Sequence, residues 1–261
     1  MHSNFSSDSD ATMESMIQAG IERGLKGLCL TDHVEFDPAP PYDEELFDPI
    51  VYRAEIERLR KIYGDKIDIR MGAEIGYQPH VIEQMNQFST TVEFDFILCS
   101  LHSIDKLDFH TLAFFENKTS DEAFESYFKA YYECAKNDTI IYNVLSHYDF
   151  LKRYTTYDGE QIFKDNFDII NATFKQLIER GKGIEVNTSG FTRYKLEHSL
   201  PSVDILKLYK ELGGEMITIG SDAHSPLHVA EHFDITCDLL KSIGFNYLTR
   251  FEKMKPEFIK L

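Results

Sequence analysis

The sequence predicts a single α/β domain of the barrel type, built from short buried strands that alternate with amphipathic helices. Short apolar segments recur between helical segments, a pattern typical of a parallel sheet covered by helices. Several such units follow one another along 261 residues without a linker, repeat or low-complexity tract, and this length is ordinary for a single-domain barrel. Each expected strand leads into a polar residue, as in barrels whose chemistry lies at the strand ends.

The first unit lies at the N-terminus. We expect a helix over residues 10–24, where apolar side chains recur at helical spacing. Ser9 or Asp10 can cap its start and Gly24 can end it. A strand over residues 28–30 follows at once and leads into Asp32 and His33.

The same unit recurs along the rest of the chain. We expect a helix over 50–63 and a strand over 67–73 that ends in Glu74, and then a strand over 94–101 that ends in His102. A helix over 122–136 precedes a strand over 140–146 that ends in His147, and a helix over 167–180 precedes a strand over 183–186 that ends in Asn187. The last unit is a helix over 205–212 and a strand over 216–220 that leads to Asp222 and His224. Because parallel strands end at one edge of their sheet, these polar side chains should converge on one mouth of the barrel.

Composition restricts the partners and the compartment. The net charge of −17 argues against a nucleic-acid or anionic-membrane partner, although bound metal ions would still admit a small anionic substrate. No apolar run approaches the ~20 residues of a membrane-spanning helix. The four cysteines are scattered and form no CxxC pair, which indicates a reducing compartment, and we expect a cytoplasmic protein: Cys29, Cys99, Cys134 and Cys237.

Half of the ten histidines occupy chemically suggestive positions. They lie at the N-terminus or at expected strand ends, together with Glu74 and Asp222: His2, His33, His102, His147 and His224. Any one of them alone would be read as a structural residue, and Asp32 and Asp149 could equally be helix caps. Together they predict a site for several divalent ions, because convergent imidazoles and carboxylates need partners, and nitrogen and oxygen ligands suit zinc, manganese or iron. The other histidines are expected at the surface or behind the ligands: His80, His110, His198, His228 and His232.

The same residues resemble the PHP family, named for polymerase and histidinol phosphatase. The shared motifs occur in family order over nearly the whole chain: H-S-x-x-S-x-D from His2 to Asp8, T-D-H ending at His33, G-x-E at Glu74, S-x-H ending at His102, H-x-D at His147 to Asp149, and G-S-D-A-H ending at His224. The segments SHYDFLKRY, EVNTSGFTR and GGEMITIGSDAHSP are similar to those of the monofunctional histidinol-phosphatase branch.

The resemblance implies a distorted (β/α)7 TIM-like barrel of the PHP type that spans residues 1–261 and holds up to three divalent ions (Zn, Mn or Fe). By position, the first ion would be bound by His2, Glu74 and Asp222, the second by Glu74, His102 and His147, and the third by Asp8, His33 and His224. The implied activity is hydrolysis of L-histidinol phosphate, a step of histidine biosynthesis, by a hydroxide that bridges the ions.

The start of the chain departs from the family pattern. The family normally begins with a strand that ends in H-x-H, and Met1 stands at the middle position of that motif. The first histidine and its strand are therefore absent from the chain as given, and we expect the natural start to lie upstream. If the chain begins here, the barrel lacks part of its first strand and the first ion has fewer ligands.

A phosphate ester also needs cationic clamps. Arg153 and Arg193 follow expected strand ends, near Asn187 in the second case, and are predicted to bind and stabilise the phosphate. Lys152 and Lys195 are weaker candidates because lysine lacks the bidentate fork of arginine. The acid that protonates the leaving oxygen stays open between His33, Asp222 and a water.

The cationic end of histidinol phosphate would favour acidic neighbours. Glu35 and Asp37 follow His33 directly and are predicted to receive it, in a loop over residues 35–48 that lines the cleft. Their alternative role is that of solvated loop acids before the turn at Pro38.

Two other functions remain open. One is a PHP phosphoesterase that acts on nucleotides, nucleic-acid ends or another small phosphate ester. The other is a metal-binding homologue with impaired catalysis, which the absent first histidine would explain. The sequence leaves the oligomeric state undetermined.

Overall fold

The computed structural model describes residues 1–155, 159–193, 196 and 198–261, and it has a curled, parallel β-sheet at its centre. The described residues form a seven-stranded sheet in the order β1-β3-β4-β7-β8-β9, with β2 paired to the far end of β3. The strands are β1 (Gly27–Leu30), β2 (His33–Val34), β3 (Asp68–Gly76), β4 (Phe96–Ser100), β7 (Val144–Leu145), β8 (Gly183–Asn187) and β9 (Ile217–Gly220). The predicted α/β fold with a curled, barrel-like parallel sheet is confirmed.

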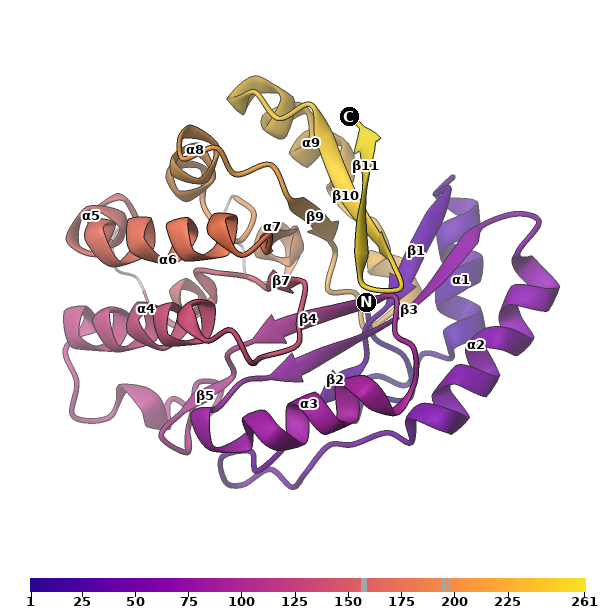
Figure 1. The fold of residues 1–261 in the computed structure, drawn as a ribbon, viewed down its shortest axis with the longest axis horizontal. Coiled ribbons are helices and arrows are strands. Elements are labelled where there is room, and N and C mark those ends of the chain that lie inside the picture. Colours follow the sequence, from indigo (N-terminus) through magenta and orange to yellow (C-terminus); the bar gives the residue numbers. More distant parts are fainter. Residues whose placement is uncertain (156–158, 194–195, 197) are drawn as a thin grey trace.

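Helices cover the outer side of this sheet, so that the strands lie inside a ring of helices (Figure 1). They are α1 (Met13–Glu22), α2 (Pro49–Tyr63), α3 (Ile82–Thr91), α4 (Ser120–Lys136), α5 (Gly159–Asp165), α6 (Phe167–Glu179), α7 (Ser189–Thr192), α8 (Val203–Glu211) and α9 (Phe233–Ile243). Short 3₁₀ turns lie at Pro79–Val81, Ala113–Phe115, Phe150–Tyr154 and Pro226–His228.

Local sequence signals fix where several helices begin. Asp48 caps α2 by accepting hydrogen bonds from the backbone amides of Ile50 and Val51, and Pro49 occupies the first turn. Thr119 and Glu122 form a reciprocal capping box at the start of α4. These caps satisfy amides that have no partner inside the helix, so the chain leaves each strand-end loop at a defined residue.

Two expected strands have different bounds in the structure. The strand expected over 140–146 is reduced to β7. Just before it, side-chain oxygens also accept from backbone amides: Asn143 accepts from the Ile97 amide and Asn86 accepts from the Ile141 amide. The strand expected to end before Glu74 continues to Gly76, and the Glu74 side chain therefore projects from the interior of β3.

The N-terminal residues lie between the two ends of the sheet. Thr31, just after β1, donates its amide to the Met1 carbonyl, and the His2 amide donates to the Ala223 carbonyl, just after β9. Beside them lies the hairpin of β10 (Tyr247–Glu252) and β11 (Lys255–Lys260), which the sequence analysis did not anticipate. Its Phe251 ring stacks on Phe96 of β4 at 5.1 Å and fills the inner end of the sheet.

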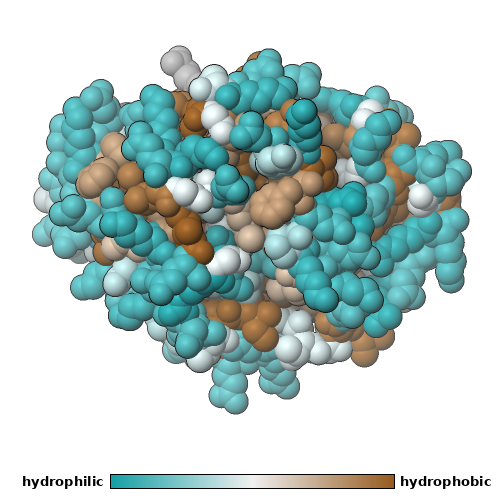
Figure 2. Space-filling model, turned by 45° about the horizontal axis from the view of Figure 1, so that its top comes forward, coloured by the Kyte–Doolittle hydropathy of each residue, from teal (hydrophilic) through white to brown (hydrophobic). Residues whose placement is uncertain are grey.

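The core between sheet and helices is rich in aromatic side chains. Tyr127, Phe128 and Tyr131 of α4 are fully buried. Phe128 and Tyr131 contact the Tyr148 ring, which in turn contacts Phe174. The molecular face in Figure 2 is mostly hydrophilic, with hydrophobic side chains in scattered patches. Within the described ranges, no helix has the length and apolar character needed to cross a membrane.

Candidate metal and phosphate site

A cleft of about 820 Å³ opens where the sheet strands end. Its wall comes from segments far apart in the sequence, and it includes most of the residues predicted for the site: Asp8, His33, Glu35, Glu74, His102, His147, Arg153, Arg193, Asp222 and His224. The convergence expected from the alternating pattern therefore occurs in the fold.

The N-terminal segment is held in this cleft by Asp32. The buried Asp32 carboxylate accepts hydrogen bonds from the amide and hydroxyl of Ser3, from the Ser6 hydroxyl at 2.9 Å and from the Tyr52 hydroxyl at 2.9 Å. The Ser6 hydroxyl in turn lies 3.3 Å from Nδ1 of His2. Asp32 thus anchors the segment that carries His2 and Asp8, and it does not cap a helix.

Glu74 is the centre of one half of the site. Its Oε2 lies 3.2 Å from Nε2 of His2, and its Oε1 lies 3.3 Å from Nε2 of His102 and 3.1 Å from Nε2 of His147. Nε2 of His2 is also 3.1 Å from Oδ1 of Asp222. The Ser100 hydroxyl, at the end of the neighbouring strand β4, donates to Glu74 Oε1 at 2.6 Å and helps to hold the carboxylate in position.

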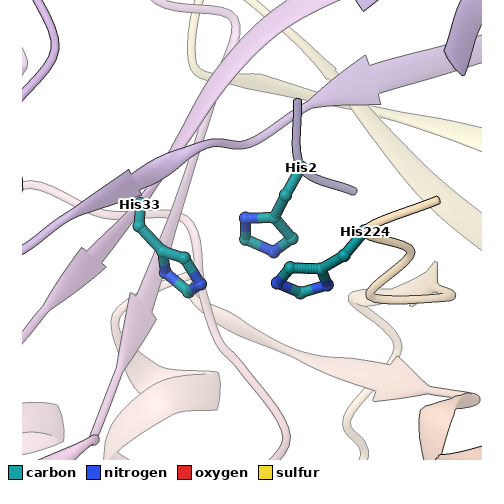
Figure 3. Close-up of side chains that lie close together, drawn as sticks. All are labelled: His2, His33 and His224. Carbon is teal, nitrogen blue, oxygen red and sulfur yellow. The ribbon is translucent and has the colours of Figure 1, made fainter. Parts of the chain in front are cut away.

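The other half of the site is formed by His33, His224 and Asp8. The His2 ring stacks on both other rings, with centroid distances of 4.2 Å to His33 and 4.2 Å to His224, and the three rings face a common space in Figure 3. Oδ2 of Asp8 lies 2.8 Å from Nε2 of His224 and 3.9 Å from Nε2 of His33.

Burial and close charges shift several pKa values in this cluster of side chains. Burial alone would lower the pKa of His2, but the carboxylates of Asp222 and Glu74 outweigh it and raise this pKa to about 9. Burial and the charge of His2 lower the pKa of His33 to about 3. The pKa of Glu74 is lowered, because hydrogen bonds from His102, His147 and His2 outweigh its burial. The centre is therefore a dense set of imidazoles and ionised carboxylates.

These donors fit divalent ions. In a tetrahedral zinc site with ligand distances of 2.0–2.1 Å, neighbouring ligand atoms lie about 3.3 Å apart. The nitrogen–oxygen distances from Glu74 to three histidines and from His2 to Asp222, 3.1–3.3 Å, match this spacing. Three groups that include the proposed ligands can each close around an ion: His2, Glu74 and Asp222; Glu74, His102 and His147; and His2, His33 and His224. Two buried imidazole nitrogens, Nδ1 of His33 and Nδ1 of His147, also have no hydrogen-bond partner among the described residues.

Two arginines line the cleft beside these groups. Nη1 of Arg193 lies 3.1 Å from Nδ1 of His224. The Arg153 guanidinium lies over the Phe150 ring at 4.3 Å and over the Tyr154 ring at 4.5 Å, and its Nη2 is 3.3 Å from Nδ1 of His110. Both positions suit the predicted contact with an anionic group in the cleft.

Other predicted residues lie elsewhere. Asn187 is buried outside the cleft lining, where its Oδ1 accepts from the Ser189 amide. Asp37 is partly exposed and pairs with His80 and Lys106. Neither position supports the predicted contact with substrate. Lys152 is buried in an ion pair with Asp149 at 2.7 Å, which ties down the turn that carries Arg153, and Lys195 lies outside the described residues.

The structure adds residues that the sequence analysis did not assign to the site. Glu185 projects from the interior of β8, accepts from the His147 amide at 3.1 Å and has a pKa raised by burial. His110, predicted among the supporting histidines, is exposed but lies in the cleft wall. The sequence analysis searched for polar residues that directly follow an apolar segment. Glu185 escapes this search because it stands inside an apolar strand.

Comparison with known proteins agrees with this geometry. The PHP domain family matches residues 1–189. The histidinol-phosphatase of Lactococcus lactis subsp. lactis is 32% identical over 97% of this chain and 93% of its own length. The probable histidinol-phosphatase of Clostridium acetobutylicum is 33% identical over 86% of this chain and 84% of its own length.

A solved structure extends the similarity to three dimensions. The crystal structure of histidinol phosphate phosphatase from Lactococcus lactis, in complex with zinc, L-histidinol and phosphate, matches with a TM-score of 0.88 and 28% identity over 98% of this chain and 97% of the other. The match covers the sheet, the helices and the strand-end cleft together. The chain therefore belongs to the PHP domain family, in its histidinol-phosphatase branch.

Proposed function

We propose that this protein is a metal-dependent phosphomonoesterase that hydrolyses L-histidinol phosphate to L-histidinol and phosphate. The observation that carries this proposal is the match over nearly the whole chain to a phosphatase whose structure contains zinc, L-histidinol and phosphate. The dense group of imidazoles and carboxylates in the strand-end cleft supports it independently.

Up to three divalent ions are held by residues of the cleft, and zinc is the ion found in the solved relative. We assign His2, Glu74 and Asp222 to the first ion, Glu74, His102 and His147 to the second, and Asp8, His33 and His224 to the third. When bound, such ions lower the pKa of water and neutralise phosphate oxygens. The protein supplies the preformed ligand spacing and the hydrogen bonds that hold it, notably those of Ser100 to Glu74 and of Asp32 to the N-terminal segment.

Arg153 and Arg193 bind the phosphate group from the cleft wall. The perpendicular rings of Phe150 and Tyr154 both contact the Arg153 guanidinium and hold it beside the cleft. A guanidinium donates two parallel hydrogen bonds to phosphate oxygens, and the charge on these oxygens grows as the ester bond breaks. These contacts orient the ester and stabilise the transition state.

Acidic side chains receive the cationic end of histidinol phosphate. Asp43 and Glu44 are exposed on the cleft wall beside Glu45, and they give this side of the cleft a negative surface. Residues 1–261 act as one domain, since the strands of a single sheet and the segments that follow them supply these groups. The free cysteines fit the cytoplasm, and the charge of −17 fits a small-molecule substrate better than a nucleic acid.

A substrate comparison tests the proposal. The zinc- or manganese-loaded protein should release phosphate from histidinol phosphate at a higher kcat/KM than from a nucleoside monophosphate or from phenyl phosphate. Faster hydrolysis of the nucleotide would show that histidinol phosphate is the wrong substrate, although the protein would still be a phosphatase. Full metal binding without hydrolysis of any phosphate ester would remove the enzyme assignment.

A further inference from the structure

Glu35, which follows β2, contacts a proposed metal ligand directly, whereas an acid that binds the substrate cation would need only to line the cleft. Its Oε1 lies 2.6 Å from Nδ1 of His102, and the two side chains are 14% and 23% exposed. We propose that Glu35 is a positioning residue that orients His102 toward the ion shared with Glu74 and His147, and that it does not bind the cation of the substrate. This inference rests on the metal site of the proposed function.

Distance separates Glu35 from the ligands of the two ions that share Glu74. The atoms assigned to shared ions around Glu74 are 3.1–3.3 Å apart, close to the spacing of about 3.3 Å in a tetrahedral zinc site. The distance of 2.6 Å between Glu35 and His102 is that of a charge-assisted hydrogen bond. Although His33, Glu35 and His102 could in principle surround an ion, the direct contact between Glu35 and His102 leaves no space for one between these two atoms.

The hydrogen bond determines which imidazole nitrogen is free. An ionised carboxylate only accepts hydrogen bonds, so Nδ1 of His102 carries the proton that Glu35 accepts. An ion binds the neutral ring, in which Nε2 has lost the proton that it shares with Glu74 and carries the lone pair. Nε2 is the atom that faces Oε1 of Glu74 at 3.3 Å. A carboxylate behind a histidine ligand fixes its tautomer and ring orientation and makes the ligating nitrogen more basic.

The fold prepares a seat for the Glu35 carboxylate. The backbone of Glu35 pairs with that of Glu45 through two hydrogen bonds of 2.8 and 3.1 Å, which fixes the start of its side chain. Its carboxyl group packs directly on Gly76, and a Cβ at position 76 would overlap that carboxyl group. The absence of a side chain at Gly76 is therefore what allows Glu35 to reach His102.

The chain offers a matched control two residues further on. Oδ2 of Asp37 lies 2.7 Å from Nε2 of His80, so the two residues make the same kind of contact, but outside the cleft and exposed to solvent. Asp37→Ala removes a carboxylate–imidazole pair of similar length, 2.7 Å against 2.6 Å, without touching a proposed ligand.

Competition for zinc with a chromophoric chelator tests the inference without turnover. We expect Glu35→Ala to lower the affinity for one zinc ion by about 10- to 100-fold, the usual effect of removing a carboxylate that hydrogen-bonds to a histidine ligand. Glu35→Gln, which keeps an acceptor oxygen without the charge, should lose less, and Asp37→Ala should bind zinc as the natural protein does. Gly76→Ala leaves Glu35 in the sequence but places a methyl group where its carboxyl group lies, and it should lower the affinity for the same ion.

Two results would overturn the inference. Unchanged zinc affinity in folded Glu35→Ala, with a KM raised for histidinol phosphate but not for phenyl phosphate, would make Glu35 a receptor for the substrate cation. Complete loss of one ion from Glu35→Ala, and equally from Glu35→Gln, would make it a direct ligand. Failure of the natural protein to bind zinc would refute the metal site itself, which is a different outcome from either of these.

Discussion

Glu74 and His2 meet at the centre of the cleft, with Oε2 of the carboxylate 3.2 Å from Nε2 of the imidazole, although one comes from the interior of β3 and the other from the N-terminal segment. The second oxygen of Glu74 faces Nε2 of His147 at 3.1 Å on the other side. One carboxylate therefore connects two groups of donors that the sequence keeps far apart.

Replacement of Glu74 should affect two ions together. In Glu74→Ala we expect the bound metal to fall by about two ions per chain, because both groups lose the ligand they share. Elemental analysis after gel filtration measures this loss, and circular dichroism confirms the fold. The exposed Glu83→Ala is the control, and full metal content in Glu74→Ala would exclude the bridging role.

Arg153 should influence substrate binding and leave the ions in place. Because a hydrogen bond to a charged group contributes about 1.5–3 kcal/mol, Arg153→Ala should raise KM for histidinol phosphate by about 10- to 100-fold at unchanged metal content. Arg153→Lys should recover only part of the loss, since lysine keeps the charge but not the fork. Steady-state kinetics on metal-loaded protein decide the matter. Kinetics identical to those of the natural protein would show that Arg153 does not bind the substrate phosphate.

Asp32 should contribute to stability through the hydrogen bonds it accepts. Asp32→Ala leaves the Ser3 amide and the buried Tyr52 hydroxyl without their acceptor, and we expect the free energy of unfolding to fall by about 3 kcal/mol. Tyr52→Phe removes one of these bonds and should cost about 1 kcal/mol. Urea denaturation of metal-stripped protein measures both, with the exposed Tyr42→Phe as control. A change below about 0.5 kcal/mol in Asp32→Ala would contradict the anchoring role.

Metal removal should destabilise the whole protein. An ion that binds only the folded state adds about 2.7 kcal/mol at a concentration one hundred times its Kd, so zinc should raise the melting temperature of chelator-stripped protein by about 5 °C or more. Differential scanning calorimetry with and without zinc provides the measurement. Glu74→Ala should show a smaller rise, and equal melting temperatures for stripped and loaded natural protein would speak against a site built into the fold.

The sequence predicts the strand-end part of the site well. His102, His147 and His224 follow short apolar segments, and parallel strands bring such positions to one edge whatever their separation in the chain. Local pattern is sufficient here because the strand alternation itself encodes the convergence.

Side-chain direction in loops and strand interiors could not be predicted in this way. Glu35 and Asp37 are equivalent in the sequence, yet one carboxylate turns to His102 and the other to the exposed His80. Glu185 gives no local signal, because an acid inside an apolar strand resembles any outward-facing position until the fold buries it. The segment 140–143 has the composition of a strand, but the Ile141 amide donates to the Asn86 side chain, a contact that the local sequence pattern does not reveal.

Anomalous diffraction at the zinc absorption edge, from crystals grown with zinc, tests the central claim most directly. We predict strong peaks on both sides of the Glu74 carboxylate, one beside His2 and Asp222 and the other beside His102 and His147. Peaks confined to the molecular surface, with these side chains contacting only one another, would contradict the account.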